Sequence, residues 1–401
     1  MAEQGVTVPL LDLKAQYATI KGDVTRAIDE VVESQWFIMG PVVKALEEEI
    51  AEYCRVPFAV ACASGTDAIL LALMALGVDP GDEVICPSYT FFATGGCVHR
   101  LGARPVFADI DPATYNVDVD TVRAAARRCT KLKAIMPVHL FGQAVDLDAF
   151  LALGEELGVP VIEDAAQAIG TQDVRGSRAG SRGAIGCFSF FPSKNLGAFG
   201  DGGILTTNDE RLAEQLGILR LHGGKPKYHH KVVGINSRLD ALHAAVLRVK
   251  LEHLDRWTAR RQAHAAWYDE AFAAAGAAPS ATPLAEGGFP LRTPAPAEGA
   301  ESRHIYNQYV IRVPAEIRDA LRDELTAKNV GTEIYYPVPL HLQECFSHLG
   351  HARGDLPHSE AAAQETIALP VYPELTGTQL EHVAKTVTRF VGKRAPAGAA
   401  T

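Results

Sequence analysis

A single lysine, Lys194, lies between an apolar aromatic segment and a glycine-rich loop. Its aromatic neighbours in sequence are Phe190, Phe191 and Phe199, and four glycines follow it within residues 187–203. An ammonium held among aromatic rings loses hydration, which lowers its pKa and leaves a free amine. Such an amine attacks carbonyl carbon and forms a Schiff base. The structural alternative is a solvated lysine on a flexible loop.

A second motif combines small and hydroxyl-bearing residues at the start of a predicted helix. Ser64, Gly65 and Thr66 follow an apolar segment, 58–62, and precede a second apolar segment. Free N–H groups and the positive end of the helix dipole attract phosphate there, and glycine lets the anion approach the backbone. The motif therefore predicts a phosphate site, with simple helix capping as the alternative.

Two carboxylates and an amide follow the apolar segment 159–162: Glu163, Asp164 and Gln167. A carboxylate at the end of a buried strand needs a cationic partner. A protonated pyridine nitrogen is one such partner, because Asp164 would keep the ring charged and able to withdraw electrons. A structural ion pair with Arg or Lys is the alternative.

Phe91, in the segment 88–92, could stack on a flat cofactor ring or pack in the core. Ser189 adds a further hydroxyl just before Lys194. The phosphate site, the stacking ring, the acid and the lysine all follow predicted strands. Together they predict pyridoxal 5′-phosphate bound to Lys194.

The segment 234–240 contains Asn236 and Arg238, which could reach a phosphate or a substrate anion. A turn followed by a helix N-terminus is the alternative interpretation. Nearby, Tyr228, His229 and His230 could contact substrate or lie in a solvated loop. We expect no metal site, because adjacent histidines lack the i, i+4 spacing of helical ligands.

The elements that would position these residues alternate between strand and helix, which predicts an α/β fold with a mostly parallel sheet covered on both faces. In such folds ligands bind beyond the carboxyl ends of the strands. The predicted strands are 58–62, 84–87, 105–109, 134–138, 159–163, 185–191 and 203–206. The predicted helices are 17–32, 42–53, 68–76, 93–101, 120–128, 147–157, 210–219, 239–253 and 257–273.

An Ala/Pro/Gly-rich stretch, 274–300, interrupts the helical pattern. We therefore expect a large domain at 1–265 and a smaller C-terminal α+β domain at 266–401. Strands are predicted in the smaller domain at 309–313 and 332–336.

The composition limits the classes of function. With 401 residues, 47% hydrophobic and 21% charged, the chain is typical of a globular two-domain protein. A net charge of −10 argues against general binding to nucleic acid or membrane surfaces, and favours a small-molecule partner. The seven cysteines form no C-x-x-C pair, which indicates reduced thiols and a cytoplasmic protein. We see no export segment and no apolar run of membrane length.

Taken together, the motifs resemble the pyridoxal-phosphate sugar aminotransferases of the DegT/DnrJ/StrS type, with fold type I, over nearly the whole chain. The residues that carry the resemblance are 64–66, 87–91, 163–167, 189–195 and 234–240. The resemblance implies a homodimer with shared active sites, to which the partner contributes Asn236 and Arg238. It also implies that L-glutamate donates an amino group, which passes to a keto group on a nucleotide-linked sugar for cell-surface polysaccharide or glycoconjugate precursors.

The resemblance also implies a role for each site residue. Lys194 would form the aldimine and move the proton, and Asp164 would pair with the ring nitrogen. Phe91 would stack on the ring, and Gln167 would contact its hydroxyl. The phosphate would be held by Ser64, Gly65, Thr66 and Ser189, with Asn236 also at the cofactor. The substrate residues would be Arg238, Tyr228, His229, His230, Tyr335 and Tyr336.

Within the family, residues 189–197 and 227–230 look most like enzymes that aminate UDP-2-acetamido-2-deoxy-3-oxo-glucuronate. Those enzymes tend to carry His-Tyr-Pro where this chain has Tyr335-Tyr336-Pro337. A dTDP-linked 3-keto-6-deoxyhexose is therefore the alternative, ahead of a 4-keto sugar. A dehydratase of the same fold would carry histidine in place of Lys194. A non-catalytic sensor of sugar nucleotides is the remaining hypothesis.

Overall fold

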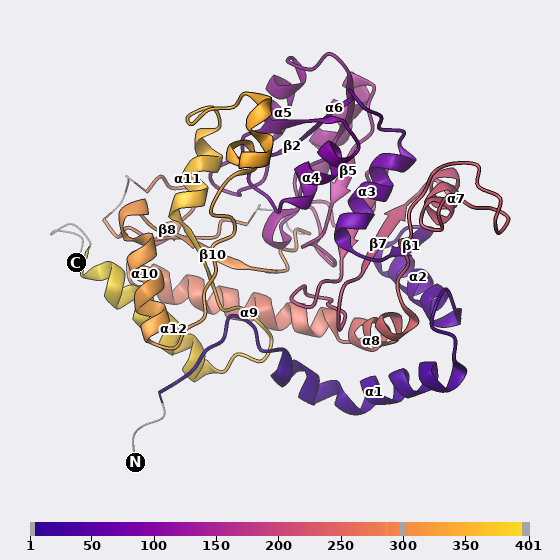
Figure 1. Cartoon of the computed structure of the whole chain (residues 1–401). Helices are drawn as coiled ribbons and strands as arrows, with labels where there is room; N and C mark the ends of the chain where they lie inside the picture. The colour runs from indigo at the N-terminus through magenta and orange to yellow at the C-terminus, as the bar shows by residue number, and fades with distance from the viewer. Residues whose placement is uncertain (1–4, 285, 287, 297–300, 395–401) are drawn as a thin grey trace.

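A computed structural model describes residues 5–284, 286, 288–296 and 301–394 (Figure 1). Part of the predicted connection at 274–300, namely residues 285, 287 and 297–300, lies outside the described residues. Among the described helices, none has the length and apolar character needed to cross a membrane.

The first part of the chain is built on one sheet with two halves. One half has the order β3-β2-β4 and the other the order β1-β7-β6-β5. Parallel backbone bridges, Ile135 to Val161 and Val138 to Asp164, join the halves. The strands are β1 (Phe58–Cys62), β2 (Glu83–Pro87), β3 (Arg104–Ala108), β4 (Leu132–Ile135), β5 (Ile162–Asp164), β6 (Ile185–Ser189) and β7 (Gly203–Thr207).

Only β7, among these strands, runs antiparallel to both of its neighbours, β1 and β6. The paired strands β2 and β3, β2 and β4, and β5 and β6 are parallel. The predicted mostly parallel sheet is therefore confirmed. Because β7 is reversed, its first residue, Gly203, lies at the same edge as Cys62, the last residue of β1.

Helices cover both faces of the sheet. Successive residues of a strand point to opposite faces, so neighbouring residues of β1 belong to different core clusters. Cys62 belongs to the core cluster formed with α3 (Gly65–Ala75), α4 (Ala93–Arg100) and α7 (Glu210–Leu219). Its neighbour Ala61 belongs to the cluster on the other face. That cluster is formed with α2 (Pro41–Cys54) and α8 (Ala241–Leu251), while α5 (Val119–Ala126) and α6 (Leu147–Leu157) pack in a further cluster around Ile85.

Long helices flank this body. Figure 1 shows α1 (Leu13–Ser34) along the lower edge, where it packs against α8. The following helix, α9 (Leu254–Ala273), is continuous across residue 265. It ends in the core cluster of the C-terminal part, where Tyr268 and Phe272 lie close to Tyr309. The division at residue 265 stays a prediction.

The C-terminal part combines a second sheet, ordered β11-β10-β9-β8, with helices. Its strands are β8 (Ala278–Pro279), β9 (Arg292–Thr293), β10 (Tyr309–Arg312) and β11 (Thr366–Leu369). Its helices are α10 (Ala315–Ala327), α11 (Pro357–Glu365) and α12 (Gly377–Gly392). Short 3₁₀ helices are η1 (Leu140–Gly142), η2 (Leu340–Leu342) and η3 (Glu344–Leu349).

The prediction of a strand at 332–336 is wrong. Only Glu333 pairs there, in an isolated bridge with Ala368. The Tyr335 carbonyl accepts a hydrogen bond from the Tyr89 hydroxyl, so a side chain takes the place of a strand partner. This segment leaves the sheet and turns toward the cavity described next.

Candidate active site

A cavity of about 420 Å³ lies at the sheet edge where β1, β5 and β6 end and β7 begins. Its lining includes most of the side chains that the sequence singled out. These are Ser64, Gly65, Thr66, Phe91, Asp164, Gln167, Ser189, Lys194, Tyr335 and Tyr336. Five segments that are separate in sequence thus meet at one site, while the roles of these residues stay predictions.

The phosphate motif forms the first turn of α3. Ser64 Oγ accepts a hydrogen bond from the Asp67 N–H at 3.1 Å, so Ser64 caps this helix. A Cβ on Gly65 would lie 2.6 Å from Ser189 Cβ, which is closer than atoms can approach. Glycine is therefore required for Ser189 to lie beside the helix N-terminus. The amides of this turn and the neighbouring hydroxyls suit a phosphate.

Asp164 is a buried carboxylate whose two oxygens are both held. Thr94 Oγ1 donates to Oδ2 at 2.8 Å, and the Ala166 N–H donates to Oδ1 at 3.2 Å. Burial raises the pKa of Asp164, and these hydrogen bonds and the charge of Lys194 offset only part of that effect. A cation placed in the cavity would stabilise the ionised carboxylate.

The adjacent carboxylate, Glu163, has a structural role. Its Oε2 lies 2.9 Å from His139 Nε2 and accepts a hydrogen bond from the Gly180 N–H. Its Oε1 accepts hydrogen bonds from the N–H groups of Arg182 and Gly183. Burial would raise the pKa of Glu163, but these hydrogen bonds bring it below its ordinary value. Successive residues of β5 thus point to opposite sides, and only Asp164 lines the cavity.

Lys194 follows β6 and supplies the amine at this site. Burial lowers the pKa of Lys194 to about 8, and the charge of Asp164 offsets part of the change. Of the aromatic side chains expected to desolvate it, Phe190 is fully buried, whereas Phe191 and Phe199 are about half exposed. At pH 7 about a tenth of an amine with this pKa is unprotonated, and that neutral form can attack a carbonyl.

Gln167 has a fixed orientation in the cavity wall. Its Oε1 accepts a hydrogen bond from the Phe141 N–H at 2.8 Å, and its Nε2 donates to the Tyr336 hydroxyl at 3.0 Å. One Nε2 hydrogen is left for a ligand, so Gln167 can donate to an oxygen on a bound ring. Phe91 lies 6.2 Å from the Tyr336 ring and is 56% exposed, which leaves its face available for stacking.

Five predicted residues do not line this cavity: Asn236, Arg238, Tyr228, His229 and His230. Tyr228 is 81% exposed, and the two histidines beside it are also exposed. Ser237 is fully buried, and its hydroxyl donates to Asp67 Oδ2 at 2.7 Å. Asn236 is exposed and Arg238 half-buried, so within one chain these residues are separate from the site.

Sequence reasoning missed several residues of this site. Thr94 is the most important: it does not line the cavity, but its hydroxyl holds Asp164, which does. Thr90, Ser193, Asp201 and Gln308 line the cavity wall. Thr90 and Thr94 are four residues apart, a spacing that places side chains on one helix face. That spacing, just after the predicted strand 84–87, was the available signal.

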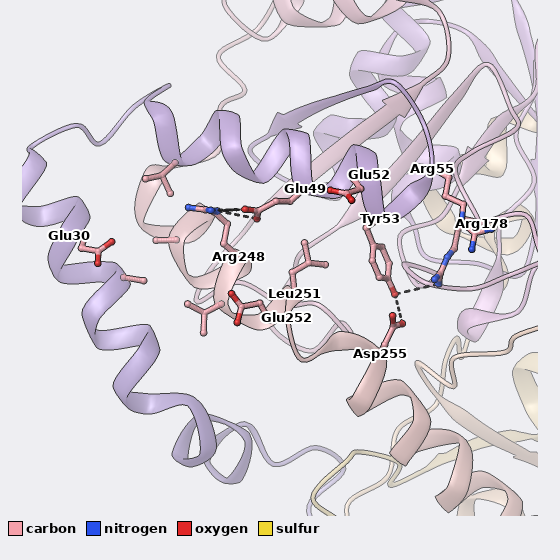
Figure 2. A pocket seen from close by; sticks show the side chains of 14 residues that line it. Glu30, Glu49, Glu52, Tyr53, Arg55, Arg178, Arg248, Leu251, Glu252 and Asp255 are labelled. Carbon is pink, nitrogen blue, oxygen red and sulfur yellow. Dashed lines mark hydrogen bonds and ion pairs between the residues drawn. The ribbon is translucent and has the colours of Figure 1, made fainter.

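A larger cavity, of about 580 Å³, lies between α1, α2 and α8 (Figure 2). It contains none of the predicted site residues. Its charged groups include internal pairs: Arg248 contacts Glu49 at 2.6 Å, and the Tyr53 hydroxyl donates to Asp255 at 2.8 Å. We therefore assign the chemistry to the smaller cavity.

The smaller cavity fits a flat, phosphorylated carbonyl cofactor on three counts. It has an amine of lowered pKa, a buried carboxylate that lacks a cationic hydrogen-bond partner among the described residues, and a glycine-containing helix N-terminus for a phosphate. Pyridoxal phosphate combines the three complementary groups: an aldehyde, a pyridine nitrogen and a phosphate.

Comparisons with known proteins agree with this geometry. Residues 18–388 match the model of the DegT/DnrJ/EryC1/StrS aminotransferase family. A pleiotropic regulatory protein of Geobacillus stearothermophilus is 47% identical over 385 residues, which cover 96% of this chain and 99% of that protein. A UDP-N-acetyl-3-dehydro-alpha-D-glucosamine 3-aminotransferase of Acidithiobacillus ferrooxidans is 41% identical and covers 96% and 98% of the two chains. The solved structure of S. venezuelae DesV in complex with a ketimine intermediate has a TM-score of 0.89 at 38% identity, covering 96% of this chain and 98% of that chain.

Proposed function

We propose a specific reaction from the premise that this chain belongs to the DegT/DnrJ/EryC1/StrS aminotransferase family. It is a pyridoxal-phosphate-dependent aminotransferase of fold type I. The proposed reaction moves the amino group of L-glutamate onto the C3 keto group of a nucleotide-linked sugar. The observation that carries it is that Lys194 and Asp164, 30 residues apart in sequence, line one cavity beside the α3 N-terminus.

When bound, pyridoxal phosphate supplies an aldehyde for condensation with amines and a ring that withdraws electrons from the adjacent carbon. Lys194 would hold the cofactor through its Nζ atom. As a free amine, the same atom would accept a proton from the substrate carbon and later return one. The lowered pKa of about 8 suits this work, because such an amine both accepts and donates protons near neutral pH.

Asp164 would keep the pyridine nitrogen protonated, since a carboxylate favours the charged form of a neighbouring base. Thr94 holds that carboxylate in place. Ser64, Gly65, Thr66 and Ser189 would bind the phosphate, while Phe91 and Gln167 would orient the ring. All of these residues except Thr94 line the cavity.

We extend the proposal to a homodimer in the cytoplasm. Large apolar side chains are exposed in the single chain, including Trp36 at 56% and Val233 at 89%. A second copy of the chain is the partner we propose for this surface. Asn236, Arg238 and the loop at 228–230 would then reach the partner's cavity. All seven cysteines are free thiols, which suits a reducing compartment.

We propose the sugar by analogy with the Acidithiobacillus relative, which is named for a UDP-linked 3-dehydro-glucosamine. The 3-oxo-glucuronate expected from the sequence motifs differs from it at C6, where a carboxylate replaces a hydroxymethyl group. Among the described residues, Lys194 is the one basic side chain that lines the cavity. A C6 carboxylate would therefore need a cation from the second subunit.

The test is amino transfer from L-glutamate to a panel of nucleotide keto sugars: UDP-linked 3-keto sugars with and without a C6 carboxylate, a dTDP-linked 3-keto-6-deoxyhexose and a 4-keto sugar. We expect a UDP-linked 3-keto sugar to give the highest kcat/KM. Bound cofactor without transfer to any of them would contradict the proposal and favour a sensor. A product that loses oxygen without gaining nitrogen would indicate a dehydratase.

A further inference from the structure

A second buried lysine, Lys250, lies near the end of α8, and the proposed reaction does not use it. Its relative exposure is 3%. Nζ donates a hydrogen bond to the Gly197 carbonyl oxygen at 2.6 Å and lies 5.2 Å from the centre of the Phe199 ring. Both contacts are made with the loop that carries Lys194.

Burying an ammonium in this position is unfavourable. Burial lowers the pKa of Lys250 to about 8, and the negative charge of Glu374 offsets part of that change. A methionine would fill similar space without the desolvation penalty. The contacts with Gly197 and Phe199 are what the ammonium provides and an apolar side chain would not.

The loop is closely packed where Lys250 reaches it. A Cβ on Gly197 would lie 2.4 Å from the Pro192 carbonyl oxygen, so the two backbone segments touch. The Ala198 N–H donates to the Phe190 carbonyl at 2.8 Å. These contacts join the residues after Lys194 to the end of β6.

A second hydrogen bond attaches the loop to another part of the chain. Asn195 Nδ2 donates to the carbonyl oxygen of Ile305 at 3.0 Å, and both residues are buried. The residue after Lys194 is thus tied to the C-terminal part of the chain. Lys250 ties the residue two positions further on, Gly197, to α8.

We infer that Lys250 is a positioning residue: its ammonium fixes the Gly197 carbonyl and thereby holds the Lys194 loop in the conformation that presents Lys194 Nζ to the cavity. This inference rests on the proposed function of Lys194 as the cofactor-binding amine. Lys250 itself does not line the cavity and acts through the loop.

The test compares K250M, which removes the donor, with K250R, which restores a charged donor. An exposed lysine, Lys44, supplies the control variant K44M. Two properties of the apoprotein are measured: amide hydrogen exchange in the loop, and the rate at which the visible cofactor band forms after pyridoxal phosphate is added. Melting temperatures are recorded alongside.

We expect K250M to form the band about tenfold more slowly and to exchange faster in the loop than in α8, because a charge-assisted hydrogen bond is lost. K250R should recover most of the rate, and K44M should match the wild type. A lower melting temperature with unchanged band formation and loop exchange would overturn the inference.

If K250M does not fold, K250Q, with a shorter neutral donor, replaces it. An intermediate rate then supports the inference, and a wild-type rate overturns it. The wild-type protein distinguishes failure of this inference from failure of the proposed function. If the wild-type protein forms no band, Lys194 does not bind the cofactor. If it forms a normal band and K250M forms the band at the same rate, only the role of Lys250 is contradicted.

Discussion

The Thr94 hydroxyl donates a hydrogen bond to Asp164 Oδ2 at 2.8 Å, and both side chains are buried. A threonine that follows one strand thus fixes the carboxylate at the end of another. Because that carboxylate is proposed to hold the pyridine nitrogen, its orientation bears directly on cofactor binding.

We predict that T94V weakens cofactor affinity about tenfold. Valine has nearly the same shape but leaves a buried carboxylate oxygen without its donor, which disfavours the ionised form of Asp164. Titration of apoprotein with pyridoxal phosphate, followed by visible absorbance, measures the effect. T94S is the matched control and should bind like the wild type. Equal affinity in T94V would show that the Ala166 amide alone suffices to hold Asp164.

The rate at which Lys194 captures the cofactor should depend on pH. The pKa of Lys194 is lowered to about 8, and only the neutral amine is nucleophilic. We therefore expect the second-order rate of band formation to rise with pH up to about 8 and then to level off. Stopped-flow absorbance of apoprotein mixed with pyridoxal phosphate gives this profile.

The variant D164N tests the cause of that profile. The Asp164 carboxylate favours the charged form of Lys194, so its removal should lower the lysine pKa further. The midpoint of the pH profile should then move to a lower pH than in the wild type. A midpoint that moves upward would show that Asp164 does not interact with Lys194 in this way. K194A should form no covalent band at any pH.

Gly65 is predicted to be intolerant of a side chain. The Cβ of G65A would meet Ser189 Cβ at 2.6 Å and Ser189 Cα at 3.1 Å, so either β6 or the first turn of α3 must move. We expect a loss of cofactor affinity of tenfold or more in the same absorbance titration.

The matched control for that change is G217A. Gly217 lies inside α7, and its Cβ would have no atom within 4 Å. Alanine there should stabilise the helix by about 1 kcal/mol without affecting the cofactor. If G65A binds the cofactor as tightly as G217A does, close packing of Gly65 against Ser189 is not needed for the phosphate site.

The sequence allowed much of this site to be predicted because the chemistry is local. Lys194 and residues 64–66 follow strands and Asp164 ends one, and parallel strands bring their carboxyl ends to one edge. The reversed direction of β7 was not predictable from its apolar pattern, which is the same in either direction. The reversal of β7 does not disrupt the edge of the sheet that forms the cavity, because β7 begins at that edge with Gly203.

Other features depend on contacts that no local pattern records. Thr94 looks like an ordinary helix residue until the fold places it beside Asp164. Tyr335 and Tyr336 belong to a segment whose sequence pattern is typical of a strand. Instead, the Tyr89 hydroxyl binds the Tyr335 carbonyl and Gln167 binds the Tyr336 hydroxyl, which holds both residues at the cavity wall. For Asn236 and Arg238, the resemblance implies a role in the partner's site, and neither residue lines the cavity of its own chain.

The last prediction concerns stability in acid and depends on His304. This ring is 8% exposed, stacks on Tyr306 at 4.0 Å and accepts a hydrogen bond from the Tyr306 N–H at Nδ1. A protonated Nδ1 could not accept that bond. Burial lowers the pKa of His304 to about 3, so the folded protein keeps the ring neutral where the unfolded chain protonates it near pH 6.5.

Because the folded-state pKa lies below the unfolded value, the unfolded chain binds more protons between about pH 6.5 and 3, and stability is lost as the pH falls through this window. By pH 5 the loss from this residue should be about 2 kcal/mol, at 1.36 kcal/mol per pH unit. H304N keeps an acceptor for the Tyr306 amide but does not titrate. Urea unfolding of both proteins at several pH values should show their difference in free energy changing with pH below 6.5 and constant above it. A constant difference down to pH 4 would mean that the His304 ring is protonated in the folded protein after all.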